Sequence, residues 1–250
     1  MTMKMAAVVS YQGLPFCGWQ IQNNGPTIQG EVEQALYRIT GEATRIIGAG
    51  RTDSGVHARG QVCSFELSQE WIPSRLVSAL NAHLPESVRV HRAYPVTNGF
   101  DARRSALWRE YIYFIWTGNS CFPHIKSMVW DTYGSWEPKV VGECCRIFQG
   151  IHDFSAFCKS KEVPPSGIRE IISMKYRKRG NLSYFRIRGN AFLNNMVRIM
   201  VGSIHMVVTG KRDPAWLSYL LSGASRTESG QTAPARGLFL WKVGYRDFIS

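Results

Sequence analysis

The sequence predicts a protein of the α/β or α+β class, with helices packed against a β-sheet. Runs rich in Val, Ile and aromatic residues recur along the chain, and segments with apolar residues at helical spacing follow several of them. This repeated strand–helix–strand order indicates a sheet with flanking helices. The chain has 250 residues, of which 44% are hydrophobic and 19% charged, so it can bury a substantial core as one large domain or two small ones.

The first expected element is an apolar strand from Lys4 to Tyr11. A helix is expected between Thr27, a good N-cap, and Gly41, a good C-terminal stop, because the apolar residues between them recur at helical spacing. A second helix over 74–84 and a strand over 88–96 follow.

A strongly aromatic strand is expected from Leu107 to Trp116. Residues 117–137 are irregular and rich in turn formers, so we place the boundary between two halves, 1–118 and 119–250, at this segment. The remaining expected elements are a helix at 138–148, a hairpin of strands 168–179 and 182–188, a helix at 191–208, a helix from Asp213-Pro214 to Leu221 and a strand at 237–245.

The chain is strongly basic. Its net charge is +12 and its isoelectric point is about 9.7, which favours a polyanionic partner, most often nucleic acid. It contains no apolar run of about 18 residues and no signal-peptide pattern at its start, so we expect a cytoplasmic protein that does not bind membranes. The six cysteines show no metal-ligand or disulfide spacing, and we interpret them as small apolar residues with no metal.

The most informative stretch is the Gly-rich loop GAGRTDSGVHARGQV, residues 48–62. Strands are expected on either side of it, at 45–47 and 62–67. Glycines allow turned backbone and close approach of a ligand, so the loop could present the carboxylate of Asp53 to a substrate. Alternatively, Asp53 only caps its own turn at Asp-Ser-Gly.

Nine consecutive residues of this loop, Gly50 to Ala58, match the signature G-R-T-D-x-G-V-H-A. The chain therefore resembles the bacterial TruA-type tRNA pseudouridine synthases. The resemblance implies that Asp53 is the catalytic nucleophile. It also implies that Arg51 holds the space vacated by a flipped base, and that Thr52 and His57 bind the substrate.

Two further motifs carry the resemblance. The pattern F-D-A-R-x-S-A-x-x-R-x-Y-x-Y matches residues 100–113, and its first tyrosine, Tyr111, packs on the target uracil in the family. The alternative is that Tyr111 is an ordinary half-buried sheet aromatic. The pattern G-x-A-F-L-x-x-M-V-R matches residues 189–198, and its arginine, Arg198, pairs with the catalytic aspartate in the family.

The resemblance extends over nearly the whole chain, with one departure from the family pattern and one further matching block. Asn194-Asn195 stands where many relatives carry basic or histidine residues, which puts RNA contacts from this turn in doubt but not the chemistry. The block 233–238, close to the site in the family, adds Leu238 as a substrate-binding residue. The implied fold is α+β, with two α/β halves around a central, mostly antiparallel sheet and a cleft.

The implied function is the isomerisation of uridine to pseudouridine in the anticodon stem-loop of tRNA, at positions 38 to 40. A base in a stem must first be flipped out. No cofactor or metal is required, and relatives act as homodimers. The alternatives are a synthase of this fold that acts on another RNA, and a catalytically silent tRNA-binding protein. Asp53 could attack as a nucleophile or start an elimination by deprotonating the sugar, and both routes stay open.

Two further polar stretches, His152-Asp153 and the basic hairpin at 168–188, could have a structural role instead of a functional one. His152-Asp153 suggests acid–base chemistry, but adjacent residues do not support each other across a site, and we expect loop packing. The basic residues of the 168–188 hairpin are interpreted as a solvated face, with an RNA-facing sheet edge as the alternative. These residues are Lys175, Arg177, Lys178, Arg179, Arg186 and Arg188.

Overall fold

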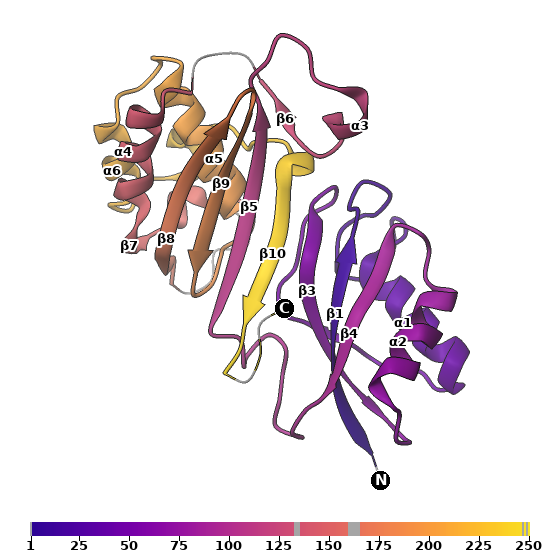
Figure 1. Cartoon of the computed structure of the whole chain (residues 1–250). Helices are drawn as coiled ribbons and strands as arrows, with labels where there is room; N and C mark the ends of the chain where they lie inside the picture. Colours follow the sequence, from indigo (N-terminus) through magenta and orange to yellow (C-terminus); the bar gives the residue numbers. More distant parts are fainter. Residues whose placement is uncertain (1, 133–135, 160–165, 247, 249) are drawn as a thin grey trace. The chain divides into compact units, whose positions relative to one another are not determined.

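The computed structural model describes residues 2–132, 136–159, 166–246, 248 and 250, and it divides into two compact units. Unit 1 consists of Met1–Leu107 and Phe239–Ser250, and unit 2 consists of Trp108–Leu238 (Figure 1). The sequence-based boundary of 118/119 differs from this division in two ways. The aromatic strand lies wholly in unit 2, and the last residues of the chain return to unit 1.

Unit 1 is built on a mostly antiparallel sheet. Its strands follow the order β4 (Val88–Pro95), β1 (Met3–Tyr11), β3 (His57–Leu67) and β10 (Leu238–Gly244). β10 is parallel to β3, and the short β2 (Ile47–Gly48) pairs antiparallel with β3. Helices α1 (Ile28–Thr40) and α2 (Pro73–His83) pack against each other, and α2 also contacts β4 (Figure 1).

Local signals at both ends fix the limits of α1. The side chain of Thr27 accepts a hydrogen bond from the Gly30 N–H at 3.2 Å, which satisfies one of the unpaired donors of the first turn. Gly41 ends the helix in the left-handed conformation, with φ 75°, and its N–H donates to the Tyr37 carbonyl. The buried apolar face includes Leu36, and burying such a side chain stabilises the fold by about 1.5–3 kcal/mol. Both predicted ends are confirmed.

The strands of unit 2 follow the order β5 (Trp108–Trp116), β9 (Leu182–Gly189), β8 (Ile168–Arg179) and β7 (Gly150–Asp153). These neighbours pair antiparallel, and β6 (Trp130–Asp131) adds to β5 in parallel. The helices of this unit are α3 (Pro123–Lys126), α4 (Pro138–Phe148), α5 (Met196–Val208) and α6 (Ala215–Leu220). α4 packs on β8 and contacts α5 and α6 (Figure 1).

Both units match the predicted α+β class, and the hairpin of β8 and β9 turns at Gly180-Asn181 as expected. Two local predictions are wrong. The helix predicted from Ala191 begins only at Met196, because Asn195 takes the left-handed conformation and breaks the helical backbone. His152 and Asp153 lie on strand β7 and pair with β8, so they are not in a loop. The sequence also predicts a charged, proline-ended loop from Lys159 to Pro165, and beyond Lys159 this loop lies outside the described residues.

The cysteines are small residues of the interior, as the sequence predicts. Five of the six are buried, and Cys17 is partly exposed. Burial raises the pKa of Cys63 to about 12, so this thiol stays protonated and is a poor nucleophile. Within the described ranges, no three His, Cys, Asp or Glu side chains gather as they would around a metal ion. None of the helices described is both long and apolar enough to span a bilayer.

Candidate functional site

The Gly-rich loop of unit 1 holds Asp53 between two anchored neighbours. On its N-terminal side, the buried Thr52 hydroxyl is 2.8 Å from the Tyr11 hydroxyl, and the Thr52 carbonyl accepts from the Trp19 N–H at 3.1 Å. Gly18 crosses this point so closely that a Cβ there would lie 2.7 Å from the Thr52 carbonyl oxygen. The main chain leading into Asp53 is therefore fixed by contacts with β1 and with the segment that follows it.

On its C-terminal side, the chain turns back at once. The Asp53 carbonyl accepts from the Val56 N–H at 3.1 Å, and Gly55 has φ 79°, the positive value that the third residue of a type II turn requires. The Ser54 hydroxyl donates to the Phe16 carbonyl at 3.1 Å. The turn is thus closed by the main-chain oxygen of Asp53. The half-buried carboxylate of Asp53 therefore extends from a constrained loop, which is the fixed placement that a nucleophile or base needs.

His57 and Arg51, two predicted substrate-binding residues, differ sharply in their surroundings. The His57 side chain is buried, its Nδ1 accepts from the Gly13 N–H at 3.2 Å, and its ring stacks on Phe239 with centroids 4.6 Å apart. Because Nδ1 accepts, the neutral ring carries its proton on Nε2. Arg51 is exposed. His57 thus anchors the end of the loop, whereas Arg51 is accessible to a ligand.

Tyr111 lies in the middle of β5, opposite Ile187 of β9, and is 8% exposed. The ring of Phe192 meets it edge-on, with centroids 5.0 Å apart and an interplanar angle of 79°. Tyr113, two residues along the same face, is fully buried, and its hydroxyl donates to the Pro234 carbonyl at 2.8 Å. Burial raises the pKa of Tyr113, although Arg198 and Arg236 oppose the shift.

Arg198 lies in the first turn of α5, and two acceptors orient its guanidinium group. Nε donates to the Ala233 carbonyl at 2.8 Å, and Nη1 donates to Oδ1 of Asn195 at 2.7 Å. The Arg198 carbonyl in turn accepts from the Ala233 N–H at 3.1 Å, so Ala233 bonds both the side chain and the main chain of this residue. The orientation of this side chain is thus built into unit 2 itself.

The predicted site residues are divided between the two units. Arg51, Thr52, Asp53 and His57 belong to unit 1, whereas Tyr111, Arg198 and Leu238 belong to unit 2. Leu238 is buried at the start of β10. Sequence reasoning missed Asn195 as a partner of Arg198, although its place three residues before the arginine was a usable signal.

Part of the positive charge of the basic hairpin is neutralised by a carboxylate on the neighbouring strand β5. The buried carboxylate of Glu110, on β5, lies 2.8 Å from a terminal nitrogen of Arg186 and 2.8 Å from one of Arg188. Arg188 also lies over the ring of Trp108, with its Cζ 4.1 Å from the centroid. The exposed cations on β8 are Lys175, Arg177, Lys178 and Arg179.

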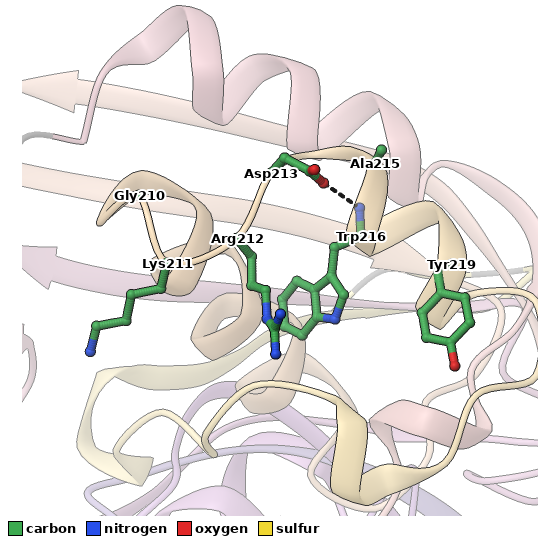
Figure 2. Close-up of a pocket in the computed structure, with 7 residues that line it drawn as sticks. All are labelled: Gly210, Lys211, Arg212, Asp213, Ala215, Trp216 and Tyr219. Carbon is green, nitrogen blue, oxygen red and sulfur yellow. Dashed lines mark hydrogen bonds between the residues drawn. The ribbon is translucent and has the colours of Figure 1, made fainter.

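A pocket of about 630 Å³ lies beside the start of α6 (Figure 2). Asp213 accepts a hydrogen bond from the Trp216 N–H at 2.9 Å, and the Arg212 guanidinium lies 5.5 Å from the centroid of the Trp216 ring. Lys211 points away from this pair in the view. The lining contains none of the predicted site residues, so this pocket is not the candidate site.

Comparison with known proteins decides the family. A family model described as tRNA pseudouridine synthase matches residues 7–103 and 144–246. The chain belongs to the tRNA pseudouridine synthase family. It is 37% identical to tRNA pseudouridine synthase A of Geobacillus kaustophilus over 253 residues, which cover 99% of this chain and 96% of the relative. It is 38% identical to the protein of the same name from Agrobacterium fabrum, over 96% of this chain and 92% of the relative.

As a member of this family, the protein is an enzyme of the isomerase class. The alternative of a catalytically silent tRNA-binding protein is thereby excluded. Among solved structures, it is similar to a chain of a Cbf5–Nop10–Gar1 complex with a TM-score of 0.39 and 14% identity, over 80% of this chain and 44% of that one. The three motifs from which the family resemblance was predicted, at 50–58, 100–113 and 189–198, all lie within the described residues.

Proposed function

We propose that this enzyme converts uridine to pseudouridine in the anticodon stem-loop of tRNA, at positions 38 to 40. The observation that supports this most is the setting of Asp53, a half-buried carboxylate on a doubly anchored loop, in a chain of this family. In the reaction the C1′–N1 bond breaks, C1′ joins C5 of the same base, the C5 proton leaves and N1 takes up a proton. Atoms and electrons balance within the nucleotide, so the chemistry needs no oxidant or reductant.

Each predicted residue receives a role in this proposal. Asp53 forms the bond to the nucleotide or starts the elimination, and it must be ionised to do either. Arg198 supplies a positive charge that favours the carboxylate form, and its pairing with Asp53 stays a prediction. Tyr111 stacks on the uracil, and Arg51 holds the space that the flipped base leaves.

The direct test is to map pseudouridine in tRNA from cells that lack the enzyme, before and after incubation with the purified protein. We expect new pseudouridine at positions 38 to 40, with one proton released from C5 for each event. Modification of ribosomal or messenger RNA alone would instead support the alternative, a synthase of the same fold with another substrate. The proposal includes a homodimer and a cytoplasmic location, both expected from the sequence, and a solution mass of two chains would support the dimer.

Binding of tRNA should weaken steeply as salt concentration rises, because the chain carries a net charge of +12. Each phosphate that a cation neutralises releases counterions, and the log–log slope of affinity against salt should be roughly −0.7 to −0.9 per contact. Fluorescence anisotropy with labelled tRNA over a range of KCl concentrations measures this slope. A flat titration would contradict binding through the phosphate backbone.

A further inference from the structure

Asn195 has an unusual backbone. Among the described residues it is the only one other than glycine with a positive φ, at 62°. A side chain in this left-handed region costs energy, although asparagine tolerates it better than most residues. Such outliers persist where the surrounding structure demands them, and they gather at functional sites.

Capping does not account for this conformation. Asn195 is the N-cap of α5, but its φ of 62° and ψ of 3° are not the extended values of an ordinary N-cap, and its side chain makes no capping hydrogen bond. Its carbonyl does accept the first helical bond, from the Ile199 N–H at 3.0 Å. A glycine could supply the same backbone with less strain.

The side-chain amide of Asn195 is used elsewhere. Its Oδ1 accepts from Nη1 of Arg198 at 2.7 Å, and its Nδ2 donates to Oδ1 of Asn194. The second bond sets the orientation of the amide, because it leaves the oxygen, not the nitrogen, facing the guanidinium. The left-handed backbone and the neighbouring asparagine thus act together to aim one oxygen at Arg198.

The guanidinium group of Arg198 is thereby held along one side. The Ala233 carbonyl accepts from Nε and Asn195 accepts from Nη1, and a planar group bound at two of its nitrogens cannot rotate without losing a bond. The half-buried position of Arg198 limits the water that could replace either acceptor.

We propose that Asn195 is a positioning residue that orients Arg198 for the reaction, and that its strained backbone is retained for this purpose. The inference rests on the proposed role of Arg198 in the isomerisation. It also gives the side chain of Asn194, which accepts a hydrogen bond from the Asn195 amide, a function in orienting the arginine.

The variant Asn195→Gly distinguishes the effect of the left-handed backbone from the effect of the side-chain amide. Glycine adopts a positive φ freely, so the melting temperature should equal or exceed that of the parent. The acceptor for Arg198 is lost, and misorientation of a group at the reacting centre should lower kcat by about tenfold or more, with KM for tRNA changed little. Asn195→Asp keeps an acceptor oxygen of the same reach and tolerates the left-handed region but loses the donor to Asn194, so its kcat should lie between those of Asn195→Gly and the parent. Asn119→Gly, in an exposed loop, is the matched control and should leave both quantities unchanged.

A double-mutant cycle distinguishes this inference from the proposed function. In an Arg198→Ala background, Asn195→Gly should cause no further loss of kcat, because its target is absent. Full turnover by Arg198→Ala would overturn the role of the arginine itself. A slow Arg198→Ala enzyme together with a fully active Asn195→Gly enzyme, or losses that simply multiply, would overturn the positioning role alone.

Discussion

Asp53→Asn should abolish pseudouridine formation, with a loss in kcat on the order of 10⁴ or more, as expected when a nucleophile or base is removed. The substitution keeps the size of the side chain and removes its charge. The main-chain bonds that build the loop, from Trp19 to Thr52 and from Val56 to residue 53, do not involve the carboxylate. The folded structure and the affinity for tRNA should therefore stay close to those of the parent.

The measurement needs two controls. An asparagine followed by Ser54 and Gly55 can deamidate back to aspartate, so Asp53→Ala should be assayed alongside. Glu86→Gln removes one carboxylate from an exposed turn and should keep full activity, which accounts for any effect of net charge. Pseudouridine produced by Asp53→Ala at a rate near that of the parent would contradict the assignment of Asp53.

The elements that were predicted well are those whose limits are set by neighbours in sequence. The α1 helix begins at Ile28 because Thr27 caps it and ends before Gly41 because glycine accepts the left-handed conformation, and both signals are visible in the sequence. The β8–β9 hairpin is also local, since its two strands turn at Gly180-Asn181. The signature loop was found in the same way, as nine consecutive residues.

The features that were missed depend on residues far apart in the chain. Arg198 receives one of its acceptors from Ala233, 35 residues away, and no local pattern indicates that contact. The helix at 196–208 was predicted too long because the apolar spacing continues through 191–195, whereas a left-handed Asn195 interrupts the backbone. The return of residues 239–250 to unit 1 is likewise a property of the fold, since a strand pattern does not reveal its partner.

The surroundings of the basic residues on the hairpin were predicted only in part, because some of their partners are also far away in the chain. Six basic residues suggested a solvated face, but the partner of two of them lies on β5, more than 70 residues earlier. Glu110 is buried, and a buried carboxylate is stable only when it is paired. The sequence shows the excess of cations, whereas their pairing with Glu110 appears only when β5 and β9 are placed side by side.

Tyr111→Phe should fold and bind tRNA normally yet turn over very slowly. Phenylalanine keeps the ring that packs edge-on against Phe192, and a stacked base contributes roughly 1–3 kcal/mol through such a ring. What it loses is the hydroxyl, which we expect to accept the C5 proton, and loss of a general base lowers the rate by about 10²–10⁴-fold. Single-turnover assays with saturating enzyme measure this step apart from binding.

The neighbouring tyrosine provides the matched control for that experiment. Tyr113→Phe also removes a hydroxyl from β5, but this hydroxyl donates to the Pro234 carbonyl, so the variant should lose about 0.5–1.5 kcal/mol of stability and far less activity. Tyr111→Leu removes ring and hydroxyl together and should bind poorly as well as react slowly. Full turnover by Tyr111→Phe would exclude the hydroxyl as the base and leave only stacking. Full activity of Tyr111→Leu would exclude both roles, and Tyr111 would then be a core residue of the sheet whose 8% exposure reflects packing alone.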